Sequence, residues 1–420
     1  APCIYIRVNN VLDALNQIAA KFYNYPGKKM ENFVVSGSYG RNSVAYIIKQ
    51  IIDNYRPCGY IGSYGVNYLN TKLLSSEPTL TVLENQRHLL KMKESGVEAA
   101  VFEATNLGLD LKKLDAIYPD AFVYTNTSIF TPDYQKFDQE FANTYIRYLN
   151  HFVEPVDVIF NMDDEIYPKV KDALKHNVVT YSLKNENANF YARDINIMAD
   201  GTTFILKCYQ STYQVNTNLI GMQNVYNILA AIATLVTRGY PVNEVVALCK
   251  NQIPPEGIMD KIDMGQNYHV IVDSCTSYET MSNVLKYARS VVDIKHKIVA
   301  LYGMNAYSSK EKRTNFGKLL DMYADIIILT EDDAYEKSVF SISSDIEDGI
   351  VDKQAIVIES REDAIYFALE LLNHGDMLLC LGKGSEKYMY RSLGKEVYLG
   401  DVEITKKYIK KRMEEKDEIS

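Results

Sequence analysis

The chain has 420 residues, of which 47% are hydrophobic and 24% are charged, and its formal net charge is −9. This composition is typical of a globular protein of two or three domains, and the acidic balance disfavours nucleic acids and anionic membranes as partners. The only basic cluster, at 406–412, is closely followed by glutamates, which is typical of a solvated helix face.

Cysteine spacing and hydropathy indicate the cellular compartment of the protein. The cysteines are scattered without CxxC or metal-ligand spacing, which favours reduced thiols. No apolar run reaches the roughly 20 residues of a membrane-spanning helix, and the N-terminus lacks the pattern of a signal peptide. We therefore expect a cytoplasmic protein without a membrane partner.

Strand and helix patterns alternate along the first half of the chain. The apolar stretches predicted as strands are Ile4–Val8, Phe33–Val35, Ala99–Phe102, Ala121–Thr125 and Val158–Phe160, and the helical patterns include 11–23, 43–53, 80–95 and 136–150. This alternation predicts a doubly wound, mostly parallel sheet whose strands are buried on both faces. Residues 201–215 instead alternate in part and predict half-exposed antiparallel strands, before a helix over 223–238.

A turn cluster at Pro254–Gly257 predicts a domain boundary near residue 256. Beyond it, helices separate a second series of predicted strands at 269–272, 297–302, 325–330, 355–358 and 377–381. The second half therefore predicts an α/β domain with its own core.

A glycine-rich turn follows the predicted strand at 33–35. Residues 36–43 read Ser-Gly-Ser-Tyr-Gly-Arg-Asn-Ser, and a helical pattern begins there. Glycines free backbone N–H groups for a phosphate, and helix N-termini favour anions. The sequence therefore predicts nucleotide binding at this loop, although an ordinary strand-to-helix turn has the same pattern. The predicted binding residues are Gly37, Ser38, Gly40, Arg41, Asn42 and Ser43.

Seven segments, in order, resemble motifs of the Mur ligases, the ATP-dependent amino-acid-adding enzymes of peptidoglycan synthesis. The segments are 37–42 for GTNGKT, 103–109 for EVSSHAL, 125–135 for TNLTQDHLDYH, 161–164 for NADD, 221–231 for GxFNVxNxLAA, 272–276 for VDYAHT and 382–386 for GKGHE. The chain is similar above all to the UDP-N-acetylmuramyl-tripeptide synthetase branch of this family.

The resemblance implies an α/β fold in two main parts. A central P-loop-type ATPase domain with a mostly parallel sheet is expected over 31–255, and a C-terminal Rossmann-like α/β domain over 256–420. Residues 1–30 are expected to be a remnant of the family's N-terminal UDP-binding domain. In the family, ATP phosphorylates a carboxylate, an amine attacks the acyl-phosphate, and phosphate leaves.

The resemblance also assigns roles to residues. Arg41 and Glu103 are expected catalytic residues. Arg41 is expected to contact phosphates, and Ser43 and Glu103 to bind Mg²⁺, although a lone acid such as Glu103 also fits a solvated or helix-capping role. Asn224 and Asn227 would contact adenine or, as the sequence favours, cap a helix. Asp273 and Lys383 are the expected catalytic residues of the second domain. Glu386 is expected to contact the ligand together with Lys383. As a glycine-flanked turn residue, Lys383 equally fits an exposed lysine without function.

Several positions depart from the family pattern. Arg41 and Asn42 replace the loop lysine and the Mg²⁺-binding hydroxyl, and Leu107 replaces a histidine. The family's DH pair becomes Phe130-Thr131, and the histidine of VDYAHT becomes Thr276 or Ser277. The family's arginine-bearing turn corresponds to residues 256–260, which contain no arginine. A carbamylated lysine that bridges a second metal would fall at about Tyr145, whose ring cannot supply that anion.

The family's DNPR box, which grips diaminopimelate, reads Asp332-Asp333-Ala334-Tyr335 here. Because the arginine that would clamp a carboxylate is absent, diaminopimelate is not the expected substrate. Two hypotheses follow. The first is an acid–amino-acid ligase with reduced or altered activity that uses ATP and Mg²⁺ on small-molecule carboxylate and amino-acid substrates. The second is an inactive paralogue that binds or regulates a protein partner.

Overall fold

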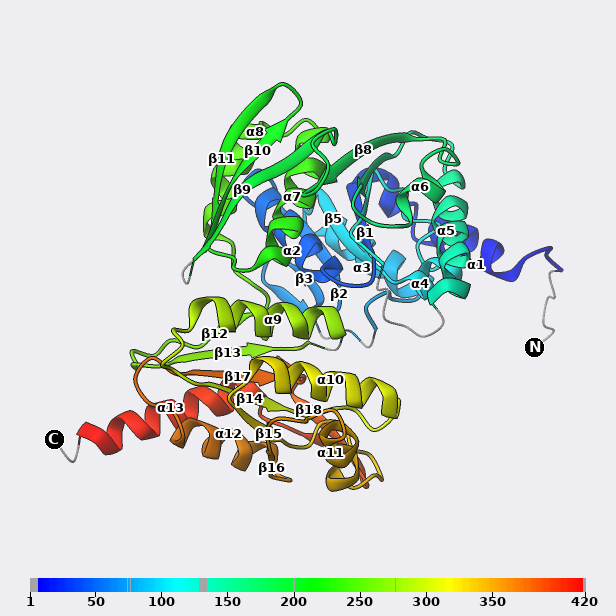
Figure 1. Ribbon diagram of the computed structural model, residues 1–420. Coiled ribbons are helices and arrows are strands. Elements are labelled where there is room, and N and C mark those ends of the chain that lie inside the picture. Colours follow the sequence, from blue (N-terminus) through cyan, green and yellow to red (C-terminus); the bar gives the residue numbers. More distant parts are fainter. Residues whose placement is uncertain are drawn as a thin grey trace. The chain divides into compact units, whose positions relative to one another are not determined.

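The computed structural model describes residues 7–73, 75, 77–127, 134–198, 201–275 and 277–417, with side chains undescribed at 134–139 and 416–417. The chain forms two compact units, Ala1–Ile253 and Pro254–Ser420, each with its own sheet and helices (Figure 1). The predicted strand at Ile4–Val8 lies mostly outside the described residues. Phe130, Thr131 and Thr276 also lie outside them. No helix in the described ranges is long and apolar enough to cross a bilayer.

The first unit contains an eleven-stranded sheet in the order β11-β10-β9-β8-β7-β6-β1-β5-β2-β3-β4 among the described residues. All pairs from β9 to β2 are parallel, which confirms the predicted mostly parallel sheet. The strands of this parallel region are β1 (Glu31–Ser36), β2 (Cys58–Gly62), β5 (Ala99–Ala104), β6 (Ala121–Tyr124), β7 (Asp157–Asn161), β8 (Asn177–Ser182) and β9 (Phe190–Met198).

Both margins of this sheet are antiparallel. The predicted antiparallel stretch forms β10 (Gly201–Cys208) and β11 (Ser211–Thr217), in which buried residues alternate with half-buried ones along β10 and with exposed ones at the end of β11. At the opposite margin, β2 turns back into β3 (Gly65–Tyr68) and then β4 (Thr71–Leu73). The sequence interpretation did not include this second antiparallel element.

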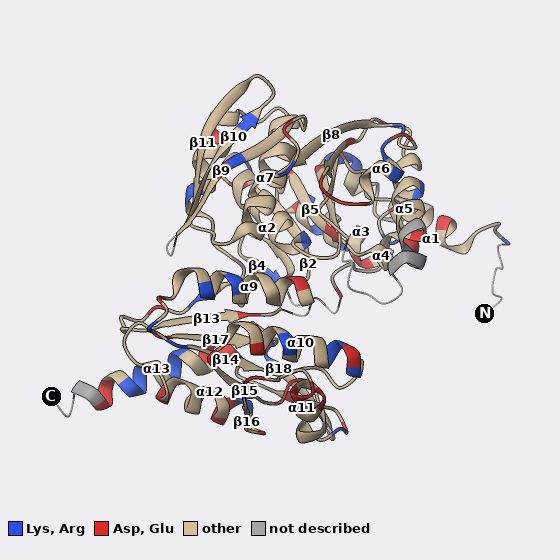
Figure 2. Ribbon diagram, in the orientation of Figure 1, with Lys and Arg blue, Asp and Glu red and all other residues tan. Residues whose placement is uncertain are grey.

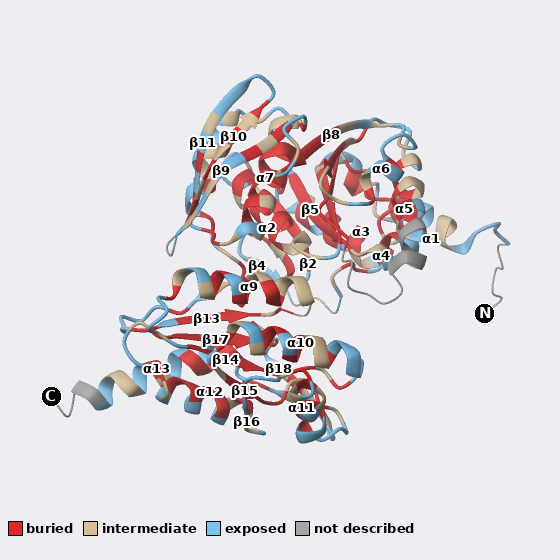
Figure 3. Ribbon diagram, in the orientation of Figure 1, coloured by how far each residue is buried: buried red, intermediate tan, exposed pale blue. Residues whose placement is uncertain are grey.

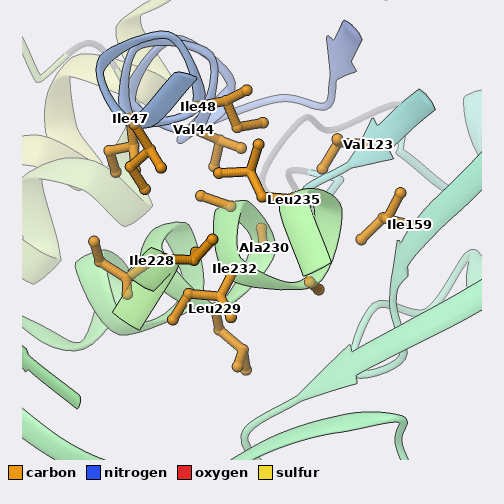
Figure 4. Close-up of a cluster of buried hydrophobic side chains, with 14 of the residues drawn as sticks. Val44, Ile47, Ile48, Val123, Ile159, Ile228, Leu229, Ala230, Ile232 and Leu235 are labelled. Atoms are coloured by element: carbon orange, nitrogen blue, oxygen red, sulfur yellow. The ribbon is translucent and has the colours of Figure 1, made fainter. Parts of the chain in front are cut away.

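Helices cover both faces of the first sheet because its strands are apolar on both sides. Phe33 and Val35 belong to the core beneath α2 (Arg41–Ile52) and α7 (Met222–Thr237), whereas Val34 faces the opposite core. In Figure 4, isoleucine and leucine side chains of α7 belong to one cluster with valine and isoleucine side chains of α2, Val123 of β6 and Ile159 of β7. The other helices of this unit are α1 (Val11–Phe22), η1 (Pro26–Lys29), α3 (Val82–Glu94), α4 (Asn106–Asp110), α5 (Tyr134–Asn150), α6 (Tyr167–Val170), α8 (Val242–Leu248) and η2 (Cys249–Asn251).

The second unit has a six-stranded sheet in the order β12-β13-β17-β14-β15-β16 and a separate hairpin, among the described residues. Every pair in the sheet is parallel except β12 with β13. The strands are β12 (Asp260–Lys261), β13 (His269–Asp273), β14 (Ile298–Tyr302), β15 (Ile326–Leu329), β16 (Ala355–Val357), β17 (Met377–Leu381), β18 (Tyr388–Arg391) and β19 (Gly394–Val397). Figure 3 shows the central strands buried and the outward helix faces exposed.

In the described part of the second unit, five helices pack around the sheet. They are α9 (Tyr278–Val291), α10 (Lys310–Tyr323), α11 (Val339–Glu347), α12 (Arg361–Glu370) and α13 (Asp401–Asp417). The basic cluster near the C-terminus lies on α13, where Lys406, Lys410 and Lys411 pair with glutamates three or four residues away (Figure 2). This pairing confirms the prediction of a solvated helix face.

Candidate functional site

The glycine-rich loop lies at the carboxyl edge of the first sheet. It leaves the end of β1, which is flanked by the parallel strands β5 and β6, and enters α2 at Arg41. Gly37 and Gly40 have φ angles of +134° and +73°, which residues with a Cβ rarely adopt. In open parallel sheets, ligands bind outside the carboxyl ends of strands where neighbouring connections diverge. The loop therefore joins a strand to a helix, as the sequence predicts.

The loop is held by the residues that follow β6. The Asn126 carbonyl accepts the Ser38 N–H at 2.8 Å, and its side-chain oxygen accepts the Tyr39 N–H at 3.0 Å. In return, the Asn126 amide and the Thr125 hydroxyl donate to the Tyr39 carbonyl at 2.8 and 2.9 Å. The loop is therefore preorganised before any ligand binds, a role for Thr125 and Asn126 that sequence reasoning missed.

The first turn of α2 has no N-cap side chain. Its N-cap is Gly40, which has no side chain to bind the unpaired N–H groups of a helix start. The Asn42 amide donates to the Tyr64 hydroxyl at 2.7 Å, and its oxygen accepts the Ser43 N–H at 2.9 Å. Ser43 itself is 7% exposed. The positive end of the helix macrodipole thus lies where the sequence predicts a phosphate.

Arg41 makes two internal contacts. Its Nη1 donates to the Gly37 carbonyl at 2.6 Å, and its Nε donates to Glu103 Oε2 at 3.2 Å. Arg41 is 17% exposed and the Glu103 side chain is fully buried. The guanidinium is therefore fixed across the loop, and Glu103 is neither solvated nor a helix cap, so that alternative interpretation of Glu103 is wrong.

Three further donors surround Glu103 from β2 and from the turn between β2 and β3. The Tyr60 hydroxyl and the Ser63 N–H donate to Oε1, the latter at 3.1 Å, and the Ser63 hydroxyl donates to Oε2 at 2.7 Å. Burial, followed by the charge of Glu103, raises the pKa of Tyr60 well above its ordinary value, so this phenol stays a donor. Sequence reasoning missed both residues, although the short run Cys58–Ile61 between Pro57 and Gly62 contains the aromatic and β-branched residues typical of strands.

These residues do not fit a Mg²⁺ site. Mg²⁺ requires several oxygen ligands in octahedral geometry, and both oxygens of Glu103 already accept two hydrogen bonds each. Tyr145 presents a phenol whose pKa burial raises to about 12, and Leu107 has no donor atom. In the described part of the chain, no three His, Cys, Asp or Glu side chains gather where they could hold a metal ion.

Asn224 and Asn227 lie in the first turns of α7, but neither caps it. Gly221 occupies the N-cap, whereas the Asn224 amide donates to the Ile220 carbonyl at 2.9 Å and the Asn227 amide donates to Asn224 Oδ1 at 3.0 Å. The capping prediction is therefore wrong. A methyl group built on Gly40 would lie 2.5 Å from Asn227 Oδ1, so Asn227 packs against the glycine-rich loop.

Asp273 ends β13 in the second unit. Its side chain is buried and accepts the Met259 N–H at 2.8 Å. Burial raises its pKa to about 7, against the opposing effect of hydrogen bonds from Met259 and Cys275. The carboxyl therefore changes its protonation state near neutral pH, as a proton-transfer group requires.

Lys383 follows the neighbouring strand β17, and its side chain is only 1% exposed. The ammonium lies 2.6 Å from Asp333, 3.4 Å from Asp332 and 2.5 Å from Glu386. Burial lowers its pKa, but the carboxylates outweigh that effect and raise it overall. The interpretation as an exposed turn lysine is wrong, because the aspartates after β15 enclose it.

Tyr335 continues the same turn with a positive φ of 50°. Its ring stacks on Tyr390 with centroids 5.1 Å apart and contacts Tyr307 at 4.7 Å. The nearby Arg391 donates two hydrogen bonds to Glu331, at 2.7 and 2.8 Å, and a third to Glu396. Tyrosine rings, rather than a guanidinium, are what this turn presents.

Two regions of the sequence match known domains. Residues 35–235 match the Mur ligase middle domain, and residues 259–384 match the Mur ligase, glutamate ligase domain. The chain belongs to the Mur ligase family. This Mur ligase therefore has the ATP-dependent amide ligase scaffold that the motif resemblance implies, and its predicted fold class is confirmed.

Curated relatives and solved structures agree with this assignment. The UDP-N-acetylmuramoyl-L-alanyl-D-glutamate–2,6-diaminopimelate ligase of Bacillus cereus is 28% identical over 97% of this Mur ligase and 84% of its own length. UDP-N-acetylmuramyl-tripeptide synthetase 2 of Oceanobacillus iheyensis is 29% identical over 89% of this chain and 77% of its own length. The Thermotoga maritima MurF ligase, solved in complex with ADP, covers 98% of this chain and 86% of its own at a TM-score of 0.68 and 16% identity, which establishes a shared fold.

Proposed function

We propose that this protein is an ATP-dependent acid–amine ligase whose nucleotide phosphates bind at the Gly37–Ser43 loop. The observation that carries the proposal is the combination at one sheet edge of two glycines with positive φ, an uncapped helix start and the Arg41 side chain. Backbone N–H groups aligned with a helix dipole and an adjacent guanidinium attract a polyanion. The ADP complex of the Thermotoga maritima relative supports the choice of nucleotide.

The proposed reaction has two steps. A substrate carboxylate oxygen attacks the γ-phosphorus of ATP, the bond to ADP breaks, and an acyl-phosphate forms. The amine nitrogen then attacks the acyl carbon, a C–N bond forms, inorganic phosphate leaves with the C–O bonding electrons, and the nitrogen loses a proton. The dipole at the start of α2 and the Arg41 guanidinium supply positive charge to the transferred group, since phosphoryl transfer depends mainly on positioning and charge stabilisation.

In the second unit, the proposed role of Asp273 stays catalytic, whereas that of Lys383 changes to positioning. Asp273 is proposed to take part in proton transfer because its pKa of about 7 suits acceptance of a proton from the attacking amine. Lys383 is proposed as a positioning residue, since its ammonium holds Asp333 and Glu386 in place. Asn224 and Asn227 are proposed to line the nucleotide site through the contact of Asn227 with Gly40.

The amine substrate is proposed to differ from the diaminopimelate named for the Bacillus cereus relative. The turn at Asp332–Tyr335 offers a stacked tyrosine where a carboxylate clamp would need a free guanidinium. Arg391 does not supply one, because Glu331 and Glu396 already occupy it. A role in peptidoglycan synthesis within the cytoplasm is likewise proposed from the relatives' names.

A second candidate function is nucleotide binding without turnover, in a protein that regulates a partner. Arg41 and Lys383, the two cations expected to serve the reaction, both pair with carboxylates of the same chain, and this favours the second candidate. Both candidates require ADP binding at the loop, so they differ only in catalysis.

Phosphate release separates the two. The protein is incubated with ATP and Mg²⁺, with UDP-N-acetylmuramoyl-L-alanyl-D-glutamate as the carboxylate, and with the standard amino acids and diaminopimelate in separate wells. The ligase proposal predicts phosphate release only when both carboxylate and an amine other than diaminopimelate are present. Release no higher than with ATP alone in every well, from protein that binds ADP, would replace it with the second candidate.

A further inference from the structure

The Glu103 carboxylate is saturated by groups of its own unit. Tyr60 and Ser63 provide an O–H and an N–H to Oε1, while Ser63 and Arg41 provide an O–H and an N–H to Oε2. A divalent cation would have to break several of these bonds in a position that excludes solvent. Breaking hydrogen bonds to a buried charged group is costly.

The Arg41–Glu103 pair also balances its own charge. One guanidinium and one carboxylate, 17% and 0% exposed, together carry no net charge. A Mg²⁺ ion bound by Glu103 would place two additional positive charges beside the guanidinium, and the resulting repulsion is strong where solvent screening is weak. The pair therefore disfavours a metal ion at this position.

Arg41 keeps the capacity to bind phosphate while it holds Glu103. Its two contacts use two of the five N–H donors of a guanidinium. The bond to the Gly37 carbonyl at 2.6 Å fixes the planar group over the loop, next to the start of α2. The remaining donors can form the charge-assisted hydrogen bonds that arginine makes with phosphate oxygens.

We propose that Arg41 is a built-in cation that replaces a metal ion at this loop, so that the loop binds the phosphates of a nucleoside diphosphate without Mg²⁺. This inference rests on the proposed nucleotide binding. It adds that affinity depends on Arg41 and not on a divalent cation held by Glu103.

Calorimetric titration of ADP at constant ionic strength, with EDTA or with excess Mg²⁺, tests the proposal. The dissociation constants are expected to agree within about threefold, which is small beside the tenfold change that about 1.4 kcal/mol produces. A Kd at least tenfold lower with Mg²⁺ would overturn the inference and leave nucleotide binding intact. Failure to bind ADP under either condition would overturn both proposals.

Variants of the pair sharpen the test. Arg41→Ala is expected to weaken ADP binding in EDTA at least tenfold, with a substantial part of the loss recovered by Mg²⁺, because Glu103 then loses one of its four hydrogen bonds and the adjacent positive charge that repels the ion. Lys49→Ala removes one positive charge from the same helix, where Lys49 pairs with Asp53, and is the matched control with unchanged affinity. Equal losses in both variants, or no loss in Arg41→Ala, would contradict the proposal.

Mn²⁺ alone provides a readout that does not require nucleotide. Electron paramagnetic resonance is expected to detect no bound Mn²⁺ at millimolar concentration in the wild-type protein and a new bound signal in Arg41→Ala. If Arg41→Ala fails to fold, Glu103→Gln serves instead, because the amide oxygen still accepts from Tyr60 and Ser63 while the guanidinium is released. Glu103→Gln is expected to bind ADP in EDTA at least as tightly as wild type, and a tenfold weaker affinity would contradict the proposal.

Discussion

Arg361 and Asp401 form a two-bond ion pair, at 2.8 and 2.7 Å, in which neither side chain is exposed to solvent. Arg361 begins α12 and Asp401 begins α13, so the pair joins two helices of the second unit. Arg361 also donates to the Leu381 carbonyl at 3.0 Å, and the Tyr398 hydroxyl donates to Asp401 at 2.6 Å. These bonds satisfy both buried charges, which otherwise would oppose folding.

Replacing only Arg361 is expected to be more harmful than replacing both partners. Arg361→Met leaves the Asp401 charge buried, and we expect the free energy of unfolding to fall by about 3–5 kcal/mol. Arg361→Met with Asp401→Leu removes both charges and is expected to recover at least half of that loss. Urea unfolding measures both, and a double variant no more stable than the single one would contradict this account.

The pKa of Asp273 predicts a specific pH dependence of stability. The folded protein holds this proton up to about pH 7, whereas an unfolded aspartate releases it near 3.8. The unfolded state therefore binds fewer protons between these values, so stability falls as pH rises from about 4 to 7 and levels off above. The total effect is on the order of 4 kcal/mol.

Asp273→Asn keeps an oxygen that accepts the Met259 N–H but cannot ionise. The free energies of unfolding of Asp273→Asn and of the wild type are measured in urea at pH 5 and at pH 8. Relative to the wild type, the variant is expected to be several kcal/mol more stable at pH 8 than at pH 5. The Cys275 thiol contributes nothing over this range because burial keeps its pKa well above the ordinary value. Parallel pH profiles for the two proteins would show that Asp273 is already ionised at pH 5.

The buried position of Lys383 predicts a structural cost for its removal. Lys383→Met leaves the carboxylates of Asp332, Asp333 and Glu386 without their cation, and we expect a loss of about 3–5 kcal/mol at pH 8. The loss is expected to shrink at pH 5, because burial raises the pKa of Asp332 and of Glu386 and so favours their protonation as the pH falls.

The matched control is Lys387→Met, because Lys387 is half exposed and pairs with the exposed Glu256. That substitution is expected to change stability by less than about 1 kcal/mol. Chemical denaturation of both variants at the two pH values measures the difference. Similar effects of the two substitutions would show that Lys383 is not enclosed as described.

Gly37 is the loop position least able to carry a side chain. A methyl group there would lie 2.0 Å from the Thr125 hydroxyl, at a φ of +134°. Gly37→Ala is expected to lower the free energy of unfolding by more than about 2 kcal/mol and to disrupt the loop. Gly96 has a φ of +84° and open space around it, so Gly96→Ala isolates the backbone cost of about 1 kcal/mol. Thermal unfolding of the two variants should separate them, and equal losses would contradict the packing of Gly37 against Thr125.

Much of the fold was predictable because its signals are local. Continuous apolar runs such as Val158–Phe160 became buried parallel strands, and the partial alternation at 201–215 became an antiparallel hairpin. The loop at Gly37–Ser43 was placed at the carboxyl edge for the same reason, since a strand, two glycines and a helix follow each other directly.

The partners of the site residues were not predictable, because they depend on contacts distant in sequence. Arg41 pairs with Glu103, 62 residues away, and nothing local indicates that pairing. Lys383 was interpreted from its neighbouring glycines, but Asp333, 50 residues away, encloses it. The capping prediction for Asn224 failed because Gly221 takes the N-cap and leaves the asparagine to bind the Ile220 carbonyl.

Calorimetric titration of ADP into the wild-type protein and into Gly37→Ala tests most directly whether the Gly37–Ser43 loop binds nucleotide phosphate. The account predicts saturable binding of one ADP per chain to the wild type, and at least tenfold weaker binding to a Gly37→Ala protein that stays folded at the temperature of the titration. Absence of binding to the wild type, or equal affinity in both proteins, would contradict it.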